Sequence, residues 1–414
     1  MQRACVACKE RLMKYVVILG DGMADWPIEE LDGKTPLEYA NTLFMDELSK
    51  KAEQGMVRTV PSGMSPGSDT ANLSVLGYDP RKYYSGRSPL EALSIGVEMK
   101  NTDVALRCNI VTLSEDEDRY ENRTIIDHSS SEISTEDAAV LLDAVKKELE
   151  RDGYKFYVGT SYRHLLIIDK GTVMPLVQPH DVLGQVVGDK LPKDQVLREM
   201  MIKSYDILVN HPINIERKKK GLNPANSLWF WGAGTKPNLS SFSEKTKKNG
   251  AMISAVDLLK GIAVGADMKV IMVEGANGGL HTNYEGKAKA AVDTLINDGN
   301  DFVYVHVEAP DEMGHQGSVE RKIKSIENLD SRIIKPIFEG VTKAGEDIRM
   351  LIMPDHPTPI KIRTHTDEPI PYMLYDSTKT LGKEPHLPYS EKNGKASGLF
   401  EENGYRLIEK LLEL

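Results

Sequence analysis

The chain has 414 residues, of which 40% are hydrophobic and 28% are charged, and its formal net charge is −10 at pH 7. This length and composition predict a globular protein of two or three domains with a large buried core. The net negative charge argues against a nucleic-acid partner, so an anionic ligand must be held by a local cluster of side chains.

The N-terminal region carries no signal for export or membrane insertion. It lacks the apolar middle of a signal peptide, and no apolar run approaches the ~18 residues that a membrane helix needs. We therefore expect a cytoplasmic protein with no membrane partner. Residues 1–11 have little apolar patterning and Met13 directly precedes a clean strand, so we expect a loose tail at residues 1–12. The three cysteines, Cys5, Cys8 and Cys108, are too few for a four-ligand zinc site, and they indicate no disulfide framework.

The first expected strand ends in a carboxylate. Residues 15–19 (YVVIL) form a short apolar run rich in β-branched residues, and Gly20 stops it, as in a buried parallel strand. Asp21 follows directly. Ligands of open α/β sheets bind outside the carboxyl ends of the strands, so Asp21 is well placed for chemistry. Taken alone, it reads more simply as a turn aspartate.

A loop rich in Gly, Pro and Ser leads into a helical pattern at Ser68. A hydroxyl at a helix N-terminus faces unpaired backbone N–H groups and the positive end of the helix dipole, which together can cradle a phosphate. Ser68 followed by Asp69 is also the pattern of a helix cap, and this loop alone favours the cap.

The middle of the chain has a different character. Residues 104–113 and 155–169 contain strands with polar turns, and 137–150 form one clear helix. The sheet pattern stops near Gly96 and resumes near 228–231. We infer an α+β domain at 100–225 that is inserted into a core formed by 13–99 and 226–414.

Three further strands near the C-terminus end at acidic residues. Residues 269–273 precede Glu274, 302–307 precede Glu308, and 350–353 precede Pro354 and Asp355. Helical patterns occur at 284–297, 319–334 and 404–414. This alternation predicts an α/β fold: a doubly wound, mostly parallel sheet with helices on both faces.

Two motifs at these strand ends carry metal-ligating residue types. Asp311 and His315 lie four residues apart, which on one helical turn aims a carboxylate and an imidazole at the same point, as a divalent metal requires. That spacing also occurs in ordinary surface pairs. Asp355, His356 and His365 follow the next strand, where a single histidine is more often packed or solvated.

The candidates are more informative together than singly, because all fall at predicted strand ends or helix starts on one edge of the sheet. Their oxygen and imidazole groups suit Mn²⁺ or Zn²⁺, and Mg²⁺ less well. Two ions about 4 Å apart can clamp the attacking and leaving oxygens of a phosphoryl group. The candidates are Asp21, Ser68, Asp311, His315, Asp355, His356 and His365.

These motifs resemble those of cofactor-independent phosphoglycerate mutases of the archaeal type, within the alkaline phosphatase superfamily. The resemblance rests on GDGMAD at 20–25, GSDTANLSVLGYDP at 67–80, APDEMGHQG at 309–317, PDH at 354–356 and THTDEPIP at 364–371. It runs from about Tyr15 to the C-terminus and is looser in the middle domain. It implies an alkaline-phosphatase-like core with an inserted substrate-binding cap.

The resemblance also implies a mechanism. A serine, Ser68, takes the phosphoryl group of a phosphoglycerate and returns it to another oxygen of the same glycerate, without 2,3-bisphosphoglycerate. Two divalent ions are expected, Mn²⁺ foremost, with Mg²⁺, Zn²⁺ or Co²⁺ as alternatives, and one would lower the pKa of the Ser68 hydroxyl. By motif, one ion would be held by Asp311, His315 and His365, and the other by Asp21, Ser68, Asp355 and His356.

The inserted domain is expected to bind the carboxylate and phosphate of the substrate. Arginine suits this task because its planar fork matches a carboxylate bidentately. Lys236, in WGAGTKP, is a candidate for neutralising the phosphoryl group. Each of these side chains could equally be an ordinary surface residue. The candidates are Arg107, Asn109, Asp127, His128, Arg163 with His164 beside it, and Lys236.

Other activities stay open on the same core. A homoserine kinase-like phosphotransferase would differ in the acceptor, and a phosphomonoesterase would admit water. A phosphate-binding module without turnover is disfavoured because Ser68 accompanies all the other ligands. We expect a monomer that acts on a small phosphorylated substrate and binds no nucleic acid.

Overall fold

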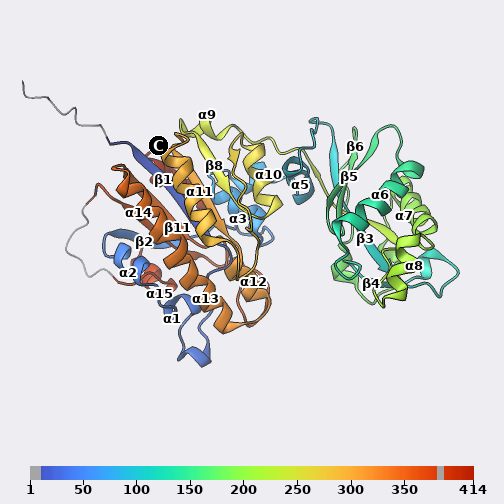
Figure 1. Ribbon diagram of the computed structural model, residues 1–414, viewed down its shortest axis with the longest axis horizontal. Helices are drawn as coiled ribbons and strands as arrows, with labels where there is room; N and C mark the ends of the chain where they lie inside the picture. Colours follow the sequence, from blue (N-terminus) through green and yellow to red (C-terminus); the bar gives the residue numbers. More distant parts are fainter. Residues whose placement is uncertain (1–10, 380–386) are drawn as a thin grey trace, which may run out of the picture. The chain divides into compact units, whose positions relative to one another are not determined.

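The computed structural model describes residues 11–379 and 387–414. The chain divides into two compact units: a core unit, Met1–Tyr84 with Asn238–Leu414, and an inserted unit, Ser85–Pro237 (Figure 1). Most of the expected tail at 1–12 lies outside the described residues, as do Cys5 and Cys8. Cys108 is buried and is a free thiol.

The core unit is built on an eight-stranded sheet in the order β13-β2-β12-β11-β1-β10-β8-β9. The pairs from β11 through β1, β10 and β8 to β9 are parallel, whereas β12 runs antiparallel to both β11 and β2. The strands are β1 (Met13–Gly20), β2 (Ala52–Val57), β8 (Gly250–Ile253), β9 (Lys269–Val270), β10 (Phe302–Val307), β11 (Asp347–Met353), β12 (Ile370–Asp376) and β13 (Phe400–Glu401).

The register of the central strands aligns their carboxyl ends. Leu19 of β1 lies beside His306 of β10 on one side and beside Met353 of β11 on the other. The residues that follow these strands, among them Asp21 and Asp355, therefore reach the same edge of the sheet.

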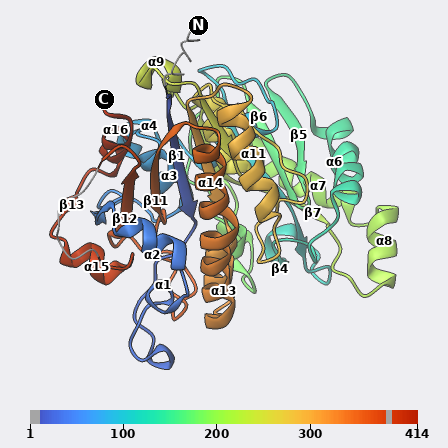
Figure 2. The ribbon, with the colours of Figure 1, turned by 60° about the vertical axis from the view of Figure 1, so that its left-hand side comes forward.

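One face of the sheet is covered by α11 (Tyr284–Ile296), α13 (Val319–Leu329) and α14 (Lys335–Lys343), and Asp330–Ile334 form a π-helical turn between the last two. Figures 1 and 2 show these helices along one face of the sheet. Val16 and Ile18 pack beneath them with Val305 in one buried cluster.

The opposite face is also covered, which is why β1 is apolar on both sides. The Tyr304 hydroxyl donates a hydrogen bond to Asn72 Oδ1 across 2.5 Å, and the rings of Phe302 and Phe242 lie 4.8 Å apart. The helices on this side include α3 (Ser68–Val75), α9 (Phe242–Thr246), α10 (Asp257–Gly265) and α16 (Leu407–Leu412). Short helices complete the unit: α1 (Pro36–Tyr39), α2 (Leu43–Ser49), α4 (Pro80–Tyr83), α12 (Ala309–His315) and α15 (Glu391–Ala396).

The predicted α/β class, with a doubly wound and mostly parallel sheet, is confirmed. The strand expected at 269–273 is shorter, because β9 pairs only with β8 at the edge of the sheet and pairing ends after Val270. The sequence pattern did not indicate the antiparallel strand β12 or its neighbour β2.

The inserted unit has its own five-stranded sheet, in which β3 pairs with β4, β6 and β7 and β6 pairs with β5. It is α+β, with all of its strand pairs antiparallel. The strands are β3 (Val104–Leu113), β4 (Ile125–Asp127), β5 (Tyr154–Thr160), β6 (Arg163–Ile168) and β7 (Ser227–Thr235), and the helices are α5 (Arg87–Ser94), α6 (Thr135–Leu149), α7 (Gln195–Leu208) and α8 (Pro212–Lys219).

The inserted unit extends beyond the 100–225 expected from the sequence. Strand β7 pairs along β3, and α5 packs against both strands, so these two elements belong with the inserted sheet rather than with the core. The pattern of β7 resembles that of a core strand, which is why the sequence placed it on the other side of the boundary.

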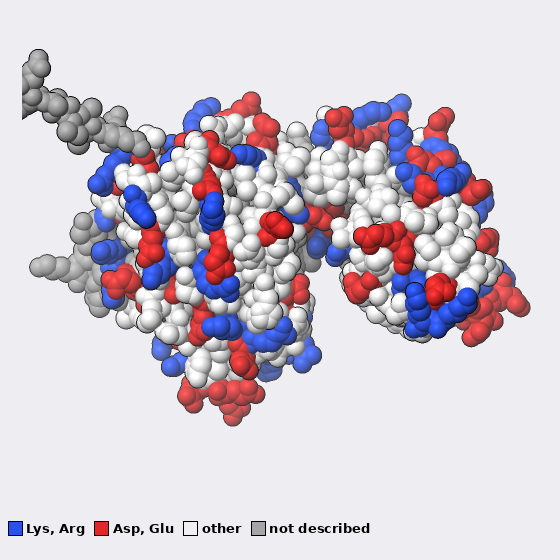
Figure 3. All heavy atoms as spheres, viewed as in Figure 1, with Lys and Arg blue, Asp and Glu red and all other residues white. Residues whose placement is uncertain are grey.

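The surface charges and the helices of the described residues agree with the expectation of a globular protein without a general basic surface or a membrane span. On the face shown in Figure 3, acidic and basic side chains are interspersed, so a general field for anions is absent from that face. Across residues 11–379 and 387–414, none of the helices combines the length and apolar character that a membrane crossing requires.

A partly buried carboxyl, that of Glu391, ties α15 to the segment after β1. Glu391 accepts hydrogen bonds from the Thr35 hydroxyl (2.7 Å) and from the Asp25 backbone N–H (3.2 Å). Burial nevertheless raises the pKa of Glu391 to about 7, above its ordinary 4.5. In the folded chain this group therefore holds a proton over a pH range in which the unfolded chain has lost it.

We predict that Glu391→Gln removes a pH-dependent loss of stability. Because the folded chain binds the extra proton between about pH 4.5 and 7, the free energy of unfolding falls as pH rises through that window. The free energy of unfolding of the variant minus that of wild type should therefore be about 1–2 kcal/mol larger at pH 8 than at pH 5. Denaturant unfolding in the presence of chelator at both pH values measures this difference. The same value at pH 5 and at pH 8 would contradict the prediction.

Candidate active site

The seven side chains expected as ligands lie together at the carboxyl edge of the core sheet. Asp21 follows β1, Ser68 begins α3, and Asp311 and His315 lie on α12. Asp355 and His356 follow β11, and His365 lies in the segment before β12. Parallel strands with aligned ends therefore bring together residues from four distant parts of the chain.

The first group comprises Asp311, His315 and His365. The Nε2 atom of His315 lies 3.2 Å from Asp311 Oδ2, and that of His365 lies 3.3 Å from Asp311 Oδ1. The two Nε2 atoms are 3.0 Å apart. His315 Nδ1 lies 2.9 Å from the Arg363 carbonyl oxygen, a contact that places the proton on Nδ1 and leaves Nε2 as a ligand atom.

The second group comprises Asp21, Ser68, Asp355 and His356. His356 Nε2 lies 3.2 Å from Ser68 Oγ, 3.5 Å from Asp355 Oδ2 and 3.6 Å from Asp21 Oδ1. The two aspartates and the histidine are buried. One ligand atom each from Asp21, Asp311 and His356 also lie within 4.8 Å of one another, so the two groups adjoin.

The electrostatics of this cluster favour a bound cation. Burial raises the pKa of Asp21 well above its ordinary value, and the nearby Asp355 and Asp311 carboxylates raise it further. Asp21 Oδ1 is buried and has no hydrogen-bond partner among the described residues. A buried carboxylate oxygen without a partner is costly, so the residues present fit a divalent cation at this position.

The ligands are held by a polar shell. Asp355 Oδ1 accepts hydrogen bonds from the backbone N–H groups of Gly22 (3.0 Å) and His356 (2.9 Å), and Oδ2 accepts one from Asn72 Nδ2 (2.9 Å). The Thr358 hydroxyl donates a hydrogen bond to Asp311. Such contacts orient carboxylates before a metal ion binds.

Ser68 is aimed at the ligand cluster. It is the first residue of α3, and its hydroxyl contacts His356 rather than capping the helix. Asp69 instead accepts hydrogen bonds from the Thr70 backbone N–H (2.9 Å) and the Tyr84 hydroxyl (2.7 Å). The geometry thus favours the phosphate cradle over the helix cap.

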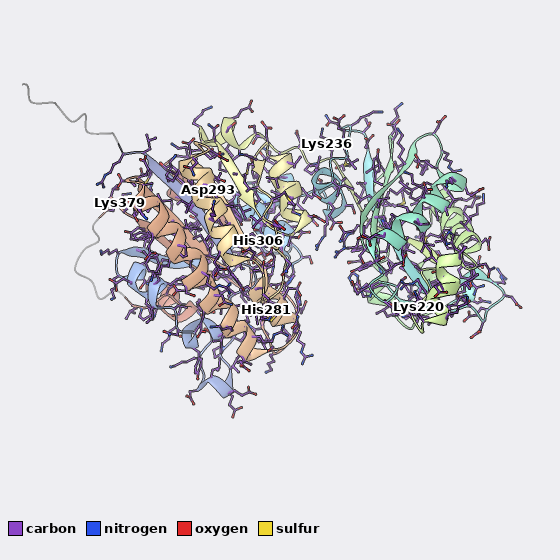
Figure 4. All side chains as sticks on the ribbon, viewed as in Figure 1. Lys220, Lys236, His281, Asp293, His306 and Lys379 are labelled. Carbon is purple, nitrogen blue, oxygen red and sulfur yellow. The ribbon has the colours of Figure 1, made fainter. Side chains whose placement is uncertain are left out.

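Sequence reasoning missed His306, which lies within β10 and is labelled in Figure 4. Its Nε2 atom is 3.1 Å from Asp21 Oδ2, and its Nδ1 atom is 3.1 Å from Glu308 Oε1. Burial disfavours charge on the imidazole, but Asp21 and Glu308 raise the pKa of His306 to about 10. A histidine in the otherwise apolar run FVYVHV was the available signal, because a buried polar side chain needs a partner.

The inserted unit contains all six expected substrate ligands; Arg107 and Asn109 contact Trp231, and His128 contacts Asn109 through its backbone carbonyl. The Arg107 guanidinium lies 4.5 Å from the centre of that ring and pairs with Glu91 through two hydrogen bonds of 2.7 Å. Asn109 Oδ1 accepts a hydrogen bond from Trp231 Nε1 (3.0 Å), and its Nδ2 donates one to the His128 carbonyl (3.3 Å). Arg107 is therefore already paired with a carboxylate of its own unit.

The other three expected ligands have different surroundings. Asp127 accepts hydrogen bonds from Asn223 Nδ2 and from the backbone N–H groups of Ser129 and Ser131, which lower its pKa to about 2 against the effect of burial. Arg163 and Lys236 are exposed. The sequence missed His180, whose ring lies 5.4 Å from that of Trp231 and 6.0 Å from that of His128.

A family model described as 2,3-bisphosphoglycerate-independent phosphoglycerate mutase matches residues 49–214. A probable 2,3-bisphosphoglycerate-independent phosphoglycerate mutase of Geobacter sulfurreducens is 47% identical over 405 residues, which cover 97% of this chain and 100% of that protein. The chain belongs to this family. The mutase of Methanosarcina acetivorans is likewise 47% identical, over 92% of this chain and 96% of its own.

Solved structures share the fold. The PH0037 protein of Pyrococcus horikoshii matches with a TM-score of 0.80 and 31% identity, over 97% of each chain. A cofactor-independent phosphoglycerate mutase of Thermoplasma acidophilum matches with a TM-score of 0.65 and 25% identity, over 97% of this chain and 99% of that one. The predicted resemblance to archaeal-type mutases is confirmed.

We predict that Gly22→Ala damages the ligand cluster. Gly22 has a φ of +58°, and an added Cβ would lie 2.5 Å from Asp311 Oδ1 and 2.8 Å from Asp311 Cα. The variant should lose about 2–4 kcal/mol of stability, because strain and crowding add, and should bind Mn²⁺ at least about tenfold more weakly. Denaturant unfolding and calorimetric Mn²⁺ titration measure these effects.

Gly33→Ala is the matched control. Gly33 has a φ of +75°, but nothing lies within 4 Å of the position of its Cβ. This variant should lose about 1 kcal/mol for the backbone alone and bind Mn²⁺ as wild type does. Equal metal affinity in the two variants would contradict the prediction.

Proposed function

We propose that the chain interconverts 3-phosphoglycerate and 2-phosphoglycerate through a phosphoserine at Ser68, independently of 2,3-bisphosphoglycerate. The observation that carries the proposal is the Ser68 hydroxyl at the start of α3, 3.2 Å from His356 in a cluster of buried metal-ligand side chains. The names of the curated relatives support the substrate.

The proposed reaction has two halves. The Ser68 oxygen forms a bond to phosphorus while the bond from phosphorus to the glycerate oxygen breaks, and the glycerate leaves with the proton that the serine gave up. The other hydroxyl of the same glycerate then attacks the phosphoserine, and its proton returns to Ser68. Backbone N–H groups at the start of α3 face the phosphoryl oxygens and stabilise their charge.

We propose that two divalent ions bind here, with Mn²⁺ the best match to the donor set. Asp311, His315 and His365 would hold one ion, and Asp21, Ser68, Asp355 and His356 the other. When bound, the ions would favour the ionised serine and neutralise the phosphoryl oxygens.

The inserted unit is proposed to bind the substrate's carboxylate and phosphate. The cationic candidates are Arg107, which pairs with Glu91, and the exposed Arg163 and Lys236. Asn109, Asp127 and His128 complete the proposed set. We continue to predict that the protein is a monomer and that it is located in the cytoplasm.

A ³¹P NMR time course tests the activity. Metal-stripped protein should leave 3-phosphoglycerate unchanged, and resupplied Mn²⁺ should restore conversion to 2-phosphoglycerate without release of free phosphate. Parallel samples with homoserine and ATP or phosphoenolpyruvate test the kinase alternative. Phosphorylated homoserine without isomerisation would replace the proposed substrate, and free phosphate alone would indicate a phosphomonoesterase.

Ser68→Ala tests the covalent mechanism. We expect it to lower kcat at least about 10³-fold, because the nucleophile is lost, while circular dichroism and the unfolding transition stay close to those of wild type. Ser62→Ala, on the exposed part of the same loop, should keep full activity. Turnover by Ser68→Ala at the wild-type rate would rule out the phosphoserine.

A further inference from the structure

A buried chain of alternating charges leads from α11 to the Asp21 carboxylate. Lys287 Nζ lies 2.8 Å from Glu308 Oε2, and Glu308 Oε1 lies 3.1 Å from His306 Nδ1. His306 Nε2 lies 3.1 Å from Asp21 Oδ2. All four side chains are buried, and we call them the buried charge chain.

The far end of this chain is fixed on several sides. Lys287 Nζ also donates a hydrogen bond to the His306 carbonyl (2.8 Å). Glu308 Oε1 also accepts hydrogen bonds from the Ala255 backbone N–H (2.9 Å) and the Ser254 hydroxyl (3.2 Å). Glu308 therefore cannot rotate without losing several contacts, and it sets the orientation of the His306 ring.

The near end of the chain engages only one oxygen of Asp21. His306 Nε2 lies 3.1 Å from Oδ2 as a close ion-pair contact, and Oδ1 lies 3.6 Å from His356 Nε2. Among the described residues, neither His306 Nε2 nor Asp21 Oδ1 has a hydrogen-bond partner. Burying paired charges rarely stabilises a fold more than apolar packing does. Four such groups in a row are thus better explained by what they do to Asp21 than by stability.

We propose that His306, oriented by Glu308 and Lys287, is a positioning residue that presents Asp21 Oδ1 to a divalent cation. The inference rests on the proposed metal site. Carboxylates that bind a metal ion are oriented by hydrogen-bonded partners behind them, and loss of such a partner costs about 10- to 100-fold in metal affinity.

His306 could instead be a ligand itself, since its Nε2 atom lies within 4.8 Å of ligand atoms of Asp21 and Asp355. Two substitutions separate the roles. His306→Gln keeps an N–H that can reach Asp21 but loses the imidazole, whereas His306→Ala loses both. A positioning role predicts that the glutamine substitution retains most of the metal affinity.

The experiment counts bound Mn²⁺ in metal-stripped full-length protein, using the EPR signal of free Mn²⁺ together with calorimetric titration. Wild type should bind two ions. His306→Ala should bind one ion with wild-type affinity and the other at least tenfold more weakly, and Glu308→Gln should weaken the same ion. The His365→Ala variant, which lacks a ligand of the other ion, should bind a single ion tightly. Adding His306→Ala to that variant should weaken the binding of this remaining ion.

Arg349→Met is the control for a lost buried ion pair. Arg349 pairs with Asp376 across 2.9 Å at the opposite end of β11, so this variant should lose stability and still bind both ions normally. Circular dichroism checks that each variant is folded. If His306→Ala does not fold, the metal count is made on His306→Gln and Glu308→Gln instead.

The outcomes are distinct. Two ions with wild-type affinities in folded His306→Ala, or in folded Glu308→Gln, would overturn the positioning role. Equal losses in His306→Gln and His306→Ala would assign His306 as a ligand instead. Fewer than two ions in wild type would overturn the two-metal proposal itself, independently of any substitution.

Discussion

The site depends on one electrostatic constraint: three carboxylates, those of Asp21, Asp311 and Asp355, are buried close together at one edge of a sheet. Loss of hydration on burial, followed by repulsion from the other two carboxylates, raises the pKa of Asp21. Both effects would destabilise the fold unless positive charge lay nearby. Histidines meet part of that demand, and the proposed divalent cations would meet it more fully. Their binding would therefore be coupled to the integrity of this edge.

Much of the surrounding structure holds these carboxylates in place. Lys322 is fully buried, and its Nζ donates hydrogen bonds to Asp25 Oδ2 and to the Thr358 carbonyl, each across 2.8 Å. Thr358 in turn donates a hydrogen bond to Asp311. Each side of the cluster is thus linked to a buried lysine. Lys322 is linked to Asp311 through Thr358, and Lys287 is linked to Asp21 through Glu308 and His306. Both cations lie one or two contacts behind the ligands, where they offset negative charge without occupying ligand positions.

The parts of this arrangement that local sequence encodes could be predicted. Apolar strands that end in acidic residues placed Asp21 and Asp355 at the sheet edge, and the spacing of Asp311 and His315 indicated a shared helical turn. His306 and Lys287 were missed because their partners come from other elements. An interior strand position, or a lysine on an amphipathic helix, gives no local sign of burial beside a carboxylate. Arg107 shows the opposite outcome: the sequence indicated a free cation, but the structure pairs it with Glu91. That pairing depends on α5 packing against β3, which the local sequence does not reveal.

In the proposed reaction, the two units would meet different physical demands of an intramolecular phosphoryl transfer. The core unit would supply Ser68 and the ligands of the proposed cations, a set that would serve any acceptor, including water. Returning the phosphoryl group to the same glycerate requires that the alcohol be held until it can attack. In the inserted unit, the guanidinium of Arg107 is locked by Glu91 against Trp231, and Asn109 is fixed to the same ring. Such preorganised groups lose little entropy on binding a small ligand. Under the proposed function, selectivity between mutase and phosphatase chemistry would therefore depend on the inserted unit, whereas the proposed nucleophile and metal ligands belong to the core unit.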